Sequence, residues 1–149
     1  MEKRFETFTL LVNKISRCIK KIKTAEVEEL NLKGPHVSCI YSIYSLGNLT
    51  AKELCEICQE DKGAMSRTIE YLETNGYIEC NSNLKKRYNS ELTLTQKGKN
   101  AGKIIANKVD NFLEIASQGL TEENRQIMYD SLKIISENLE NICKNYQGE

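Results

Sequence analysis

The segment from Thr50 to Gly98 constrains the fold of this chain more than any other part of it. Thr50 and Glu53 are spaced as a capping box, in which each side chain satisfies a backbone N–H group at a helix start. Asp61 is placed to cap a second helix, because its carboxylate suits the positive end of the helix dipole. Gly76 stands where a left-handed residue ends that helix. The spacing therefore predicts two short helices separated by a three-residue turn.

Two β-strands are predicted after these helices, over Tyr77 to Asn81 and over Ser90 to Leu94, with a basic loop between them. Two helices joined by a tight turn and followed by such a hairpin form a helix-turn-helix with a wing. In a helix-turn-helix the second helix enters the major groove of DNA. The question for function is whether that helix offers contacts to phosphates and bases.

Long amphipathic helices are predicted on both sides of this central segment. The first is expected to end near Glu29 or Leu30, and a buried helix over Val37 to Leu46 follows it. In the first helix the apolar residues are spaced alternately three and four positions apart, as in a coiled coil. They are Phe5, Phe8, Val12, Ile15, Ile19 and Ile22. Thr95 is expected to cap another long helix, with the inner face Ala101, Ile104, Ile105, Val109, Phe112 and Ala116. Gly119 ends that helix, and Thr121 caps the last one.

The central segment is too small to cover the apolar stripes of all these helices. We therefore expect a homodimer, in which a second chain covers what is left. The predicted dimerisation residues are Phe8, Val12, Ile15, Ile19, Leu132, Ile135, Leu139 and Ile142. The alternative is a monomer in which the terminal helices cover one another. A dimer is favoured because a protein that binds DNA gains from contacting two half-sites.

The second helix of the motif has a predicted buried stripe of Met65, Ile69 and Leu72. Its other side chains would face DNA, and with the wing tip they form the predicted DNA-binding set: Lys62, Gly63, Ala64, Ser66, Arg67, Glu70, Lys85, Lys86 and Arg87. Arg67 is the best candidate for a base contact, because a guanidinium matches guanine O6 and N7. The three bases of the wing suit backbone phosphates. Alternatively, these are ordinary solvent-exposed charges.

The same residues carry a resemblance to the MarR (multiple antibiotic resistance regulator) family of winged helix-turn-helix repressors. The matching motifs are Leu49-Thr50-x-x-Glu53-Leu54, Asp61-Lys62-x-x-Met65-Ser66-Arg67, Leu72-Glu73-x-x-Gly76-Tyr77-Ile78 and Leu94-Thr95-x-Lys97-Gly98. The resemblance implies a mainly α fold with a small β-hairpin wing, framed by N- and C-terminal dimerisation helices. One domain is expected over 1–149, with the winged helix-turn-helix at 34–98 and dimerisation helices at 1–33 and 99–149.

This chain departs from the family pattern in two places. The family's wing usually carries an Asp two residues before an Arg, whereas Lys85 stands two residues before Arg87. The second helix has Gly63 and Ala64 where hydroxyl residues are common in the family. The family's wing pairing and its operator preference therefore do not transfer to this chain.

The six cysteines and the single histidine have more than one interpretation. Cys55 and Cys58 are three residues apart, but a closed zinc site needs four ligands, so two core thiols are favoured and no metal is expected. Cys18 has basic neighbours, which lower a thiol pKa, and it is a candidate for redox sensing or for an effector pocket. His36 begins the second predicted helix, where it is either a plain surface or capping residue, the favoured interpretation, or lines the effector pocket.

Composition limits the remaining classes of protein. Lysine plus arginine and aspartate plus glutamate both number 21, so diffuse attraction to nucleic acid is not implied. The charge is uneven, however, with five bases and one acid between Asn83 and Lys99, and three bases and eight acids from Asp110 to Glu149. No apolar run is long enough to span a membrane, and no signal peptide is evident, so a cytoplasmic protein with reduced thiols is expected.

The sequence predicts a DNA-binding transcriptional regulator, expected to be a ligand- or stress-responsive repressor. Its partners would be a pseudo-palindromic double-stranded operator, a second copy of the chain and a small-molecule effector. No enzyme is expected, because there is no phosphate-binding loop and no pairing of a nucleophile with a base, and no cofactor is expected. The alternatives are a winged-helix module that binds protein in place of DNA, and a thiol-based redox regulator.

Overall fold

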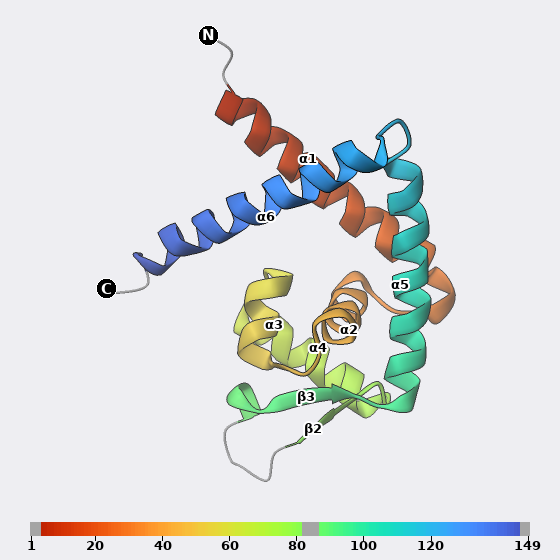
Figure 1. Cartoon of the computed structure of the whole chain (residues 1–149). Coiled ribbons are helices and arrows are strands. Elements are labelled where there is room, and N and C mark those ends of the chain that lie inside the picture. The colour runs from red at the N-terminus through yellow and green to blue at the C-terminus, as the bar shows by residue number, and fades with distance from the viewer. Residues whose placement is uncertain (1–3, 82–86, 147–149) are drawn as a thin grey trace. The chain divides into compact units, whose positions relative to one another are not determined.

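The computed structural model describes residues 4–81 and 87–146, which form six α-helices, two short 3-10 helices (η1 and η2) and a three-stranded antiparallel sheet (Figure 1). The elements are α1 (Arg4–Glu26), η1 (Glu28–Leu30), α2 (Gly34–Leu46), β1 (Leu49–Thr50), α3 (Ala51–Cys58), α4 (Lys62–Thr74), β2 (Ile78–Cys80), η2 (Arg87–Asn89), β3 (Glu91–Leu94), α5 (Gln96–Ala116) and α6 (Glu122–Lys144). The chain divides into two compact units, one ending at Asp110 and the other beginning at Asn111. The fold class predicted from the sequence is confirmed.

The helix starts of the central motif are the ones that the sequence predicted. The Thr50 hydroxyl accepts a hydrogen bond from the backbone N–H of Glu53 at 3.2 Å, and the Glu53 carboxylate accepts one from the Thr50 N–H at 2.7 Å. Asp61 Oδ1 accepts from the Ala64 N–H at 2.8 Å. Gly76 has a φ of 74°, a left-handed conformation that costs glycine little. The start of α4 is therefore set by a local side chain, and its end by the left-handed backbone of Gly76.

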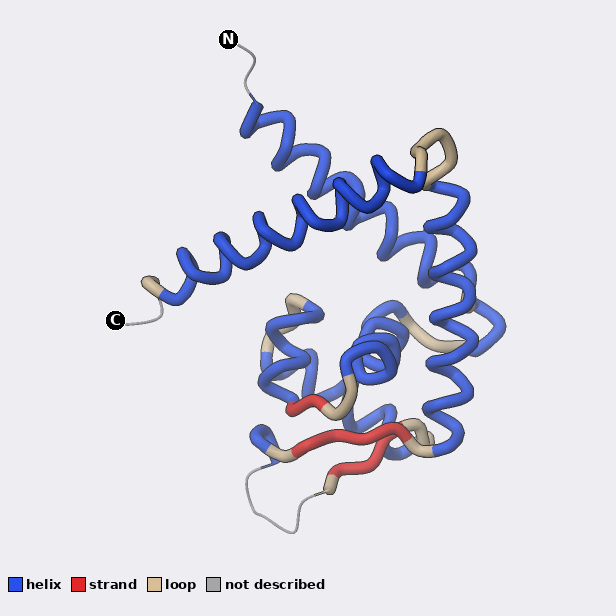
Figure 2. Tube along the Cα trace, viewed as in Figure 1, coloured by secondary structure: helices blue, strands red, loops and turns tan. Residues whose placement is uncertain are grey.

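The sheet has the strand order β1-β3-β2, so β3 is its central strand (Figure 2). In the hairpin, Ile78 pairs with Leu94 and Cys80 with Leu92. The first strand, β1, was not predicted, and it pairs Leu49 with the same Leu92. With only two residues, β1 has no alternating pattern to detect, and only β3, about forty residues later in the chain, makes it a strand.

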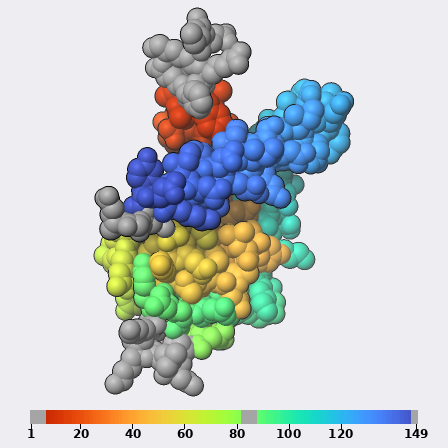
Figure 3. All heavy atoms as spheres, turned by 60° about the vertical axis from the view of Figure 1, so that its left-hand side comes forward, coloured from red at the N-terminus to blue at the C-terminus, as the bar shows by residue number. Residues whose placement is uncertain are grey.

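One hydrophobic core fills the first unit, between α2, α3, α4, α5 and the sheet. Its largest fully buried side chains include Ile40, Leu54, Met65, Leu72, Ile78, Leu92 and Ile105. Figure 3 shows α3 in yellow and the β3 segment in green at one continuous surface of this unit, and η2 packs against α3. The core therefore includes residues from the helix-turn-helix and from the strands of the predicted wing.

The predicted inner face of α5 is correct in its middle and wrong at two positions. Ala101, Ile105 and Val109 are buried, but Ile104 and Ala116 are exposed. The sequence analysis missed a contact that α5 makes through a glycine. Gly102 lies so close to the Tyr44 ring that an added Cβ would be 2.5 Å from it. A hydrophobic pattern cannot detect such a contact, because glycine carries no apolar side chain.

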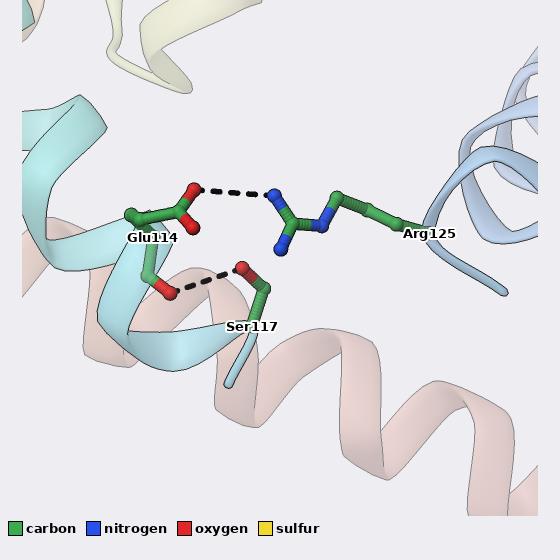
Figure 4. Close-up of polar contacts among 3 residues, drawn as sticks. All are labelled: Glu114, Ser117 and Arg125. Atoms are coloured by element: carbon green, nitrogen blue, oxygen red, sulfur yellow. Dashed lines mark hydrogen bonds and ion pairs between the residues drawn. The ribbon is translucent and has the colours of Figure 1, made fainter. Parts of the chain in front are cut away.

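The second unit holds the end of α5 and all of α6. Gly119, with a φ of 92°, separates the two helices, and the Thr121 hydroxyl accepts from the Asn124 N–H at 3.2 Å as the predicted cap. Arg125 in the first turn of α6 reaches back to α5, where its Nη1 lies 3.1 Å from Oε2 of Glu114 (Figure 4). Ser117 Oγ donates to the Glu114 carbonyl oxygen at 3.1 Å. None of the described residues of α6 is buried.

Candidate nucleic-acid interface

The second helix of the motif, α4, presents a polar face to solvent. Met65 and Leu72 are fully buried, and Thr68, which the sequence did not place inside, is buried beside them. Ile69, expected in the same stripe, is half-buried. The exposed residues on this helix include five of the six predicted to face DNA: Lys62, Gly63, Ser66, Arg67 and Glu70; the sixth, Ala64, is half-buried. Their outward position is confirmed, and their contact with DNA stays a prediction.

The far end of α4 is fastened to the start of α5. Thr95 Oγ1 donates to the carbonyl oxygen of Gly76 at 2.5 Å and accepts from the Gly98 N–H at 3.1 Å. Lys97 Nζ donates to the Asn75 carbonyl oxygen at 2.8 Å and lies 4.3 Å from the centre of the Tyr77 ring. A cation at the last carbonyls of a helix also suits the helix dipole. The Thr95-x-Lys97-Gly98 motif is therefore a clamp on the C-terminal end of the candidate recognition helix.

The wing is described only in part. Lys85 and Lys86 lie outside the described residues, as does the side chain of Arg87, so their predicted phosphate contacts stay predictions. The next residue, Tyr88, is half-buried in η2, and Lys62 Nζ lies 4.6 Å from the centre of its ring. The beginning of α4 is therefore in contact with the wing.

A cavity of about 1250 Å³ opens beside the other edge of α4, between that helix, the end of α1 and the start of α2. The recognition helix contributes Ala64, Arg67, Thr68 and Tyr71 to its wall. Its charged lining is mostly basic: Arg17, Lys20, Lys21, Lys33 and Arg67, against Glu28 and Glu60. Arg67, predicted as a base-contacting residue, is thus also part of a cavity wall, a placement that was not predicted from the sequence.

His36 lines this cavity, whereas Cys18 does not. The His36 Nδ1 accepts from the Lys33 N–H at 3.2 Å, so the capping role is confirmed, but the side chain is buried and not at the surface. Burial lowers the pKa of His36, and the nearby charge of Lys33 lowers it further. An accepting Nδ1 must lack a proton, so the hydrogen bond and the pKa shift both favour the neutral ring.

Two of the cysteines, Cys39 and Cys58, are buried in the core and do not form a reactive centre with Cys18. Cys58 is buried, its Sγ lies 3.9 Å from Ser42 Oγ, and burial raises its pKa. Burial also raises the pKa of Cys39 far above its ordinary value, and Cys18 is exposed on α1. The described part of the chain contains no group of three histidine, cysteine or acidic side chains that could hold a metal ion. Cys55 is only half-buried, unlike the core position predicted for it.

One buried charge was missed by the sequence analysis. Lys23, in the last turn of α1, is only 8% exposed, and its Nζ lies 4.9 Å from the centre of the Tyr41 ring on α2. Burial lowers the pKa of Lys23, partly offset by the nearby Cys58. The charge pattern of α1 gave no sign of this, because Lys23 follows Lys20 and Lys21 in one basic run. Lys23 joins α1 to the winged core.

The residues predicted to lie between two chains carry much exposed apolar surface. Ile15 is 55% exposed on α1, and Leu139 and Ile142 are 51% and 50% exposed on α6. Val12 and Leu132 are exposed as well, whereas Phe8, Ile19 and Ile135 are half-buried. Among the helices of the described ranges, none is long and apolar enough to cross a membrane. Dimerisation itself stays a prediction.

Comparison with known proteins agrees with this architecture. The family model of the winged helix DNA-binding domain matches residues 37–113. A putative MarR family regulator from Listeria monocytogenes, solved in complex with 26mer DNA, is 27% identical, covers 93% of each chain and superposes with a TM-score of 0.76. Staphylococcus aureus MarR, solved with salicylate and kanamycin, is 21% identical over 94% of this chain and 95% of its own, with a TM-score of 0.75.

A relative found by its sequence is also described as a transcriptional regulator. The HTH-type transcriptional regulator YybA of Bacillus subtilis (strain 168) is 23% identical over 129 residues, which are 87% of this chain and 86% of that protein. The chain belongs to the winged helix DNA-binding domain family and is a transcriptional regulator of the MarR type.

Proposed function

We propose that this chain represses transcription as a homodimer that binds a pseudo-palindromic operator, each protomer placing α4 in a major groove. The observation that carries the proposal is the exposed polar face of α4, with Lys62, Ser66 and Arg67 all outward and both helix ends fixed. A guanidinium suits a guanine edge, and a lysine and a serine suit phosphates. The DNA complex of the similar Listeria protein supports the same use of this fold.

The apolar faces of α1 and α6 support the homodimer. Full burial of an exposed isoleucine or leucine is worth about 1.5–3 kcal/mol, and these side chains, which are about half exposed, would each gain roughly half of that. Contiguous apolar patches of this kind are unusual on monomers. A two-fold dimer would also place two copies of α4 about one helical turn of DNA apart, roughly 34–36 Å, as two half-sites require.

An effector would bind in the basic cavity beside α4. Five basic side chains and two acidic ones line it, and the His36 and Tyr71 rings offer a flat aromatic wall, so the cavity suits a small planar anion. The salicylate and kanamycin found with the similar Staphylococcus protein support a small-molecule effector in this fold. Arg67 would then serve both ligands, and an anion that holds its guanidinium would weaken contact with DNA. This gives the coupling between the two sites that regulation requires.

One experiment tests the core of the proposal. The purified protein selects bound sequences from random duplex DNA, and the affinity for the selected duplex is then measured over a range of salt. We expect an inverted-repeat sequence and a steep loss of affinity with salt, because released counterions drive binding to phosphates. If no sequence is enriched and binding is absent or insensitive to salt, the winged-helix protein-interaction module is the better explanation.

The effector is tested separately, with salicylate as the probe of a planar anion. Salicylate should weaken binding of the selected duplex, and Lys20→Gln should reduce that effect because Lys20 lines the cavity. Lys103→Gln on α5 is the matched control, since Lys103 is exposed and does not line the cavity. An equal effect of salicylate on both variants would place the effector elsewhere. Cys18→Ser tests the redox alternative, which requires loss of oxidant sensitivity in that variant.

A further inference from the structure

The wing of this chain lacks an acidic residue that is usual in the family it resembles. The family's wing usually pairs an Asp with an Arg two residues later, and here the first of these positions is Lys85. That pairing cannot form with a lysine. Tyr88, three residues after Lys85, ends the wing loop just before β3 and is the first residue after it whose side chain the structure describes.

Tyr88 touches both helices of the helix-turn-helix. Its ring lies 4.6 Å from Lys62 Nζ in the first turn of α4, a distance at which an ammonium is attracted to the face of an aromatic ring. Desolvation raises the pKa of its hydroxyl, and the nearby Cys55 thiol on α3 raises it further. The 3-10 helix η2, which holds Tyr88, packs against α3. The half-buried Tyr88 therefore joins the wing, α3 and the start of α4.

The contact also adjoins a hollow of about 350 Å³ between α4 and the wing. Lys62, Ser66 and Glu70 of α4 line one side of this hollow, and Tyr88 and Leu92 line the other. Apart from α4, the helices contribute only Ala51, at the start of α3, and Tyr88 in η2 to this lining. The hollow lies beside Tyr88, while α4 also packs against β2 of the wing. Tyr88 therefore adds a contact between η2 and the start of α4 to that packing.

We infer that Tyr88 is a positioning residue for DNA binding: it fixes the wing against α4 and holds the Lys62 ammonium at the DNA-facing edge. The inference rests on the proposed function, because it assumes that Lys62 contacts DNA. A cation over a ring keeps its N–H groups free on the side away from the ring, where a phosphate can accept them. Tyr88 thus restricts a flexible lysine to one region before DNA arrives, which lowers the entropy lost on binding.

The first test observes the contact in the free protein. In protein labelled at the lysine ε-carbons, the Lys62 ε-methylene protons should be shifted upfield by the Tyr88 ring current. Tyr88→Phe should keep the shift, Tyr88→Leu should abolish it, and exposed Lys103 should show no shift in any form. An unshifted Lys62 signal in the unmutated protein would overturn the inference, whether or not the variants fold.

The second test uses the duplex selected by the unmutated protein, so failure of that selection would count against the proposed function and not against Tyr88. Tyr88→Leu should weaken binding by about two- to fivefold per protomer, the scale of an exposed cation–π contact. Tyr88→Phe should recover most of this loss. Lys62→Met should lower the salt slope by about one for each protomer, because one phosphate contact is lost, whereas Lys103→Met should leave it unchanged.

The double variant Tyr88→Leu/Lys62→Met separates positioning from general stability. If Tyr88 acts through Lys62, the double variant should bind no more weakly than Lys62→Met alone, since the contact is already lost. Fully additive losses, or a Tyr88→Leu variant that binds like the unmutated protein, would overturn the inference. A lowered melting temperature with additive losses would assign Tyr88 a purely structural role.

Discussion

The ring of His36 on α2 lies parallel to the ring of Tyr71 on α4, with ring centres 4.0 Å apart and an angle of 5° between the planes. The stack joins the candidate recognition helix to the start of α2, and it forms part of the cavity wall. Because His36 also accepts the Lys33 N–H through Nδ1, protonation of the ring would turn this acceptor into a donor. The titratable His36 side chain thus caps the start of α2, stacks on Tyr71 and lines the cavity.

His36 makes stability depend on pH in a predictable direction. Burial lowers its pKa in the folded chain below the ordinary value of 6.5, so the unfolded chain binds the proton more readily. This contribution to stability is full above pH 6.5 and is lost as the pH falls from 6.5 towards the folded pKa. Urea unfolding at pH 7.5, 6.5 and 5.5 should show falling stability, and His36→Gln should flatten the trend over this range. An equal slope in both proteins would contradict the assignment.

The contacts at the end of α4 predict that replacing Gly98 by alanine destabilises the fold much more than replacing Gly63 does. A Cβ at Gly98 would overlap the backbone carbonyl of Tyr77, which cannot move without disturbing β2 and the Thr95 hydrogen bonds. We expect Gly98→Ala to destabilise the fold by about 1–3 kcal/mol, the usual scale for overpacking.

Gly63→Ala is the matched control for this prediction, because a Cβ there meets only side-chain atoms, the nearest Asp61 Oδ1 at 3.2 Å. Alanine favours a helix by about 1 kcal/mol over glycine, so this variant should be neutral or more stable. Thermal unfolding of the two variants in parallel checks both. Equal melting temperatures would show that the junction between α4 and α5 is looser than the structure indicates.

Arg67→Ala should abolish specific DNA binding and leave the fold unchanged. Arg67 is exposed on α4, so its removal leaves no buried cavity. A lost bidentate base contact costs about 1–3 kcal/mol per half-site, and the loss should be confined to the base that Arg67 contacts. Titration of the selected duplex and of single-base variants measures this. Unchanged affinity for the selected duplex would show that Arg67 does not contact DNA. Lys103→Ala is the control for the loss of one positive charge.

The parts of the fold that could be predicted from the sequence are those set by neighbouring residues. Capping by Thr50 and Asp61, and the left-handed Gly76, depend on hydrogen bonds or backbone freedom within a few residues. The exposed face of α4 follows from helical period alone.

What the sequence did not reveal depends on residues far apart in the chain. The strand β1 exists because Leu49 meets Leu92, and the stack exists because His36 meets Tyr71. The burial of Lys23 depends on Tyr41 of the next helix. None of these pairs has a spacing signal, because their separation reflects the packing of whole helices and not a local period. That Arg67 is exposed on α4 and also lines the cavity is hidden for the same reason.

Leu139→Asp should disrupt the proposed dimer and, with it, DNA binding. Leu139 is half exposed at 51% on α6, in line with Leu132, Ile135 and Ile142 at helical spacing. A charge placed in an apolar interface must lose its water, which costs several kcal/mol. Both half-sites must be held at a fixed distance, so specific binding should fail although Leu139 is far in sequence from α4. Folding yield should fall as well, because obligate dimers often lack a stable single chain.

The matched control introduces the same aspartate on the opposite side of the same helix. Lys133 is exposed and lies away from the apolar line, so Lys133→Asp changes charge and helix propensity without entering the proposed interface. Light scattering at micromolar concentration should give a two-chain mass for the unmutated protein and for Lys133→Asp, and a single-chain mass or aggregate for Leu139→Asp. A single-chain mass for the unmutated protein would refute the dimer and the two-half-site mechanism together, because one α4 helix cannot occupy two major grooves.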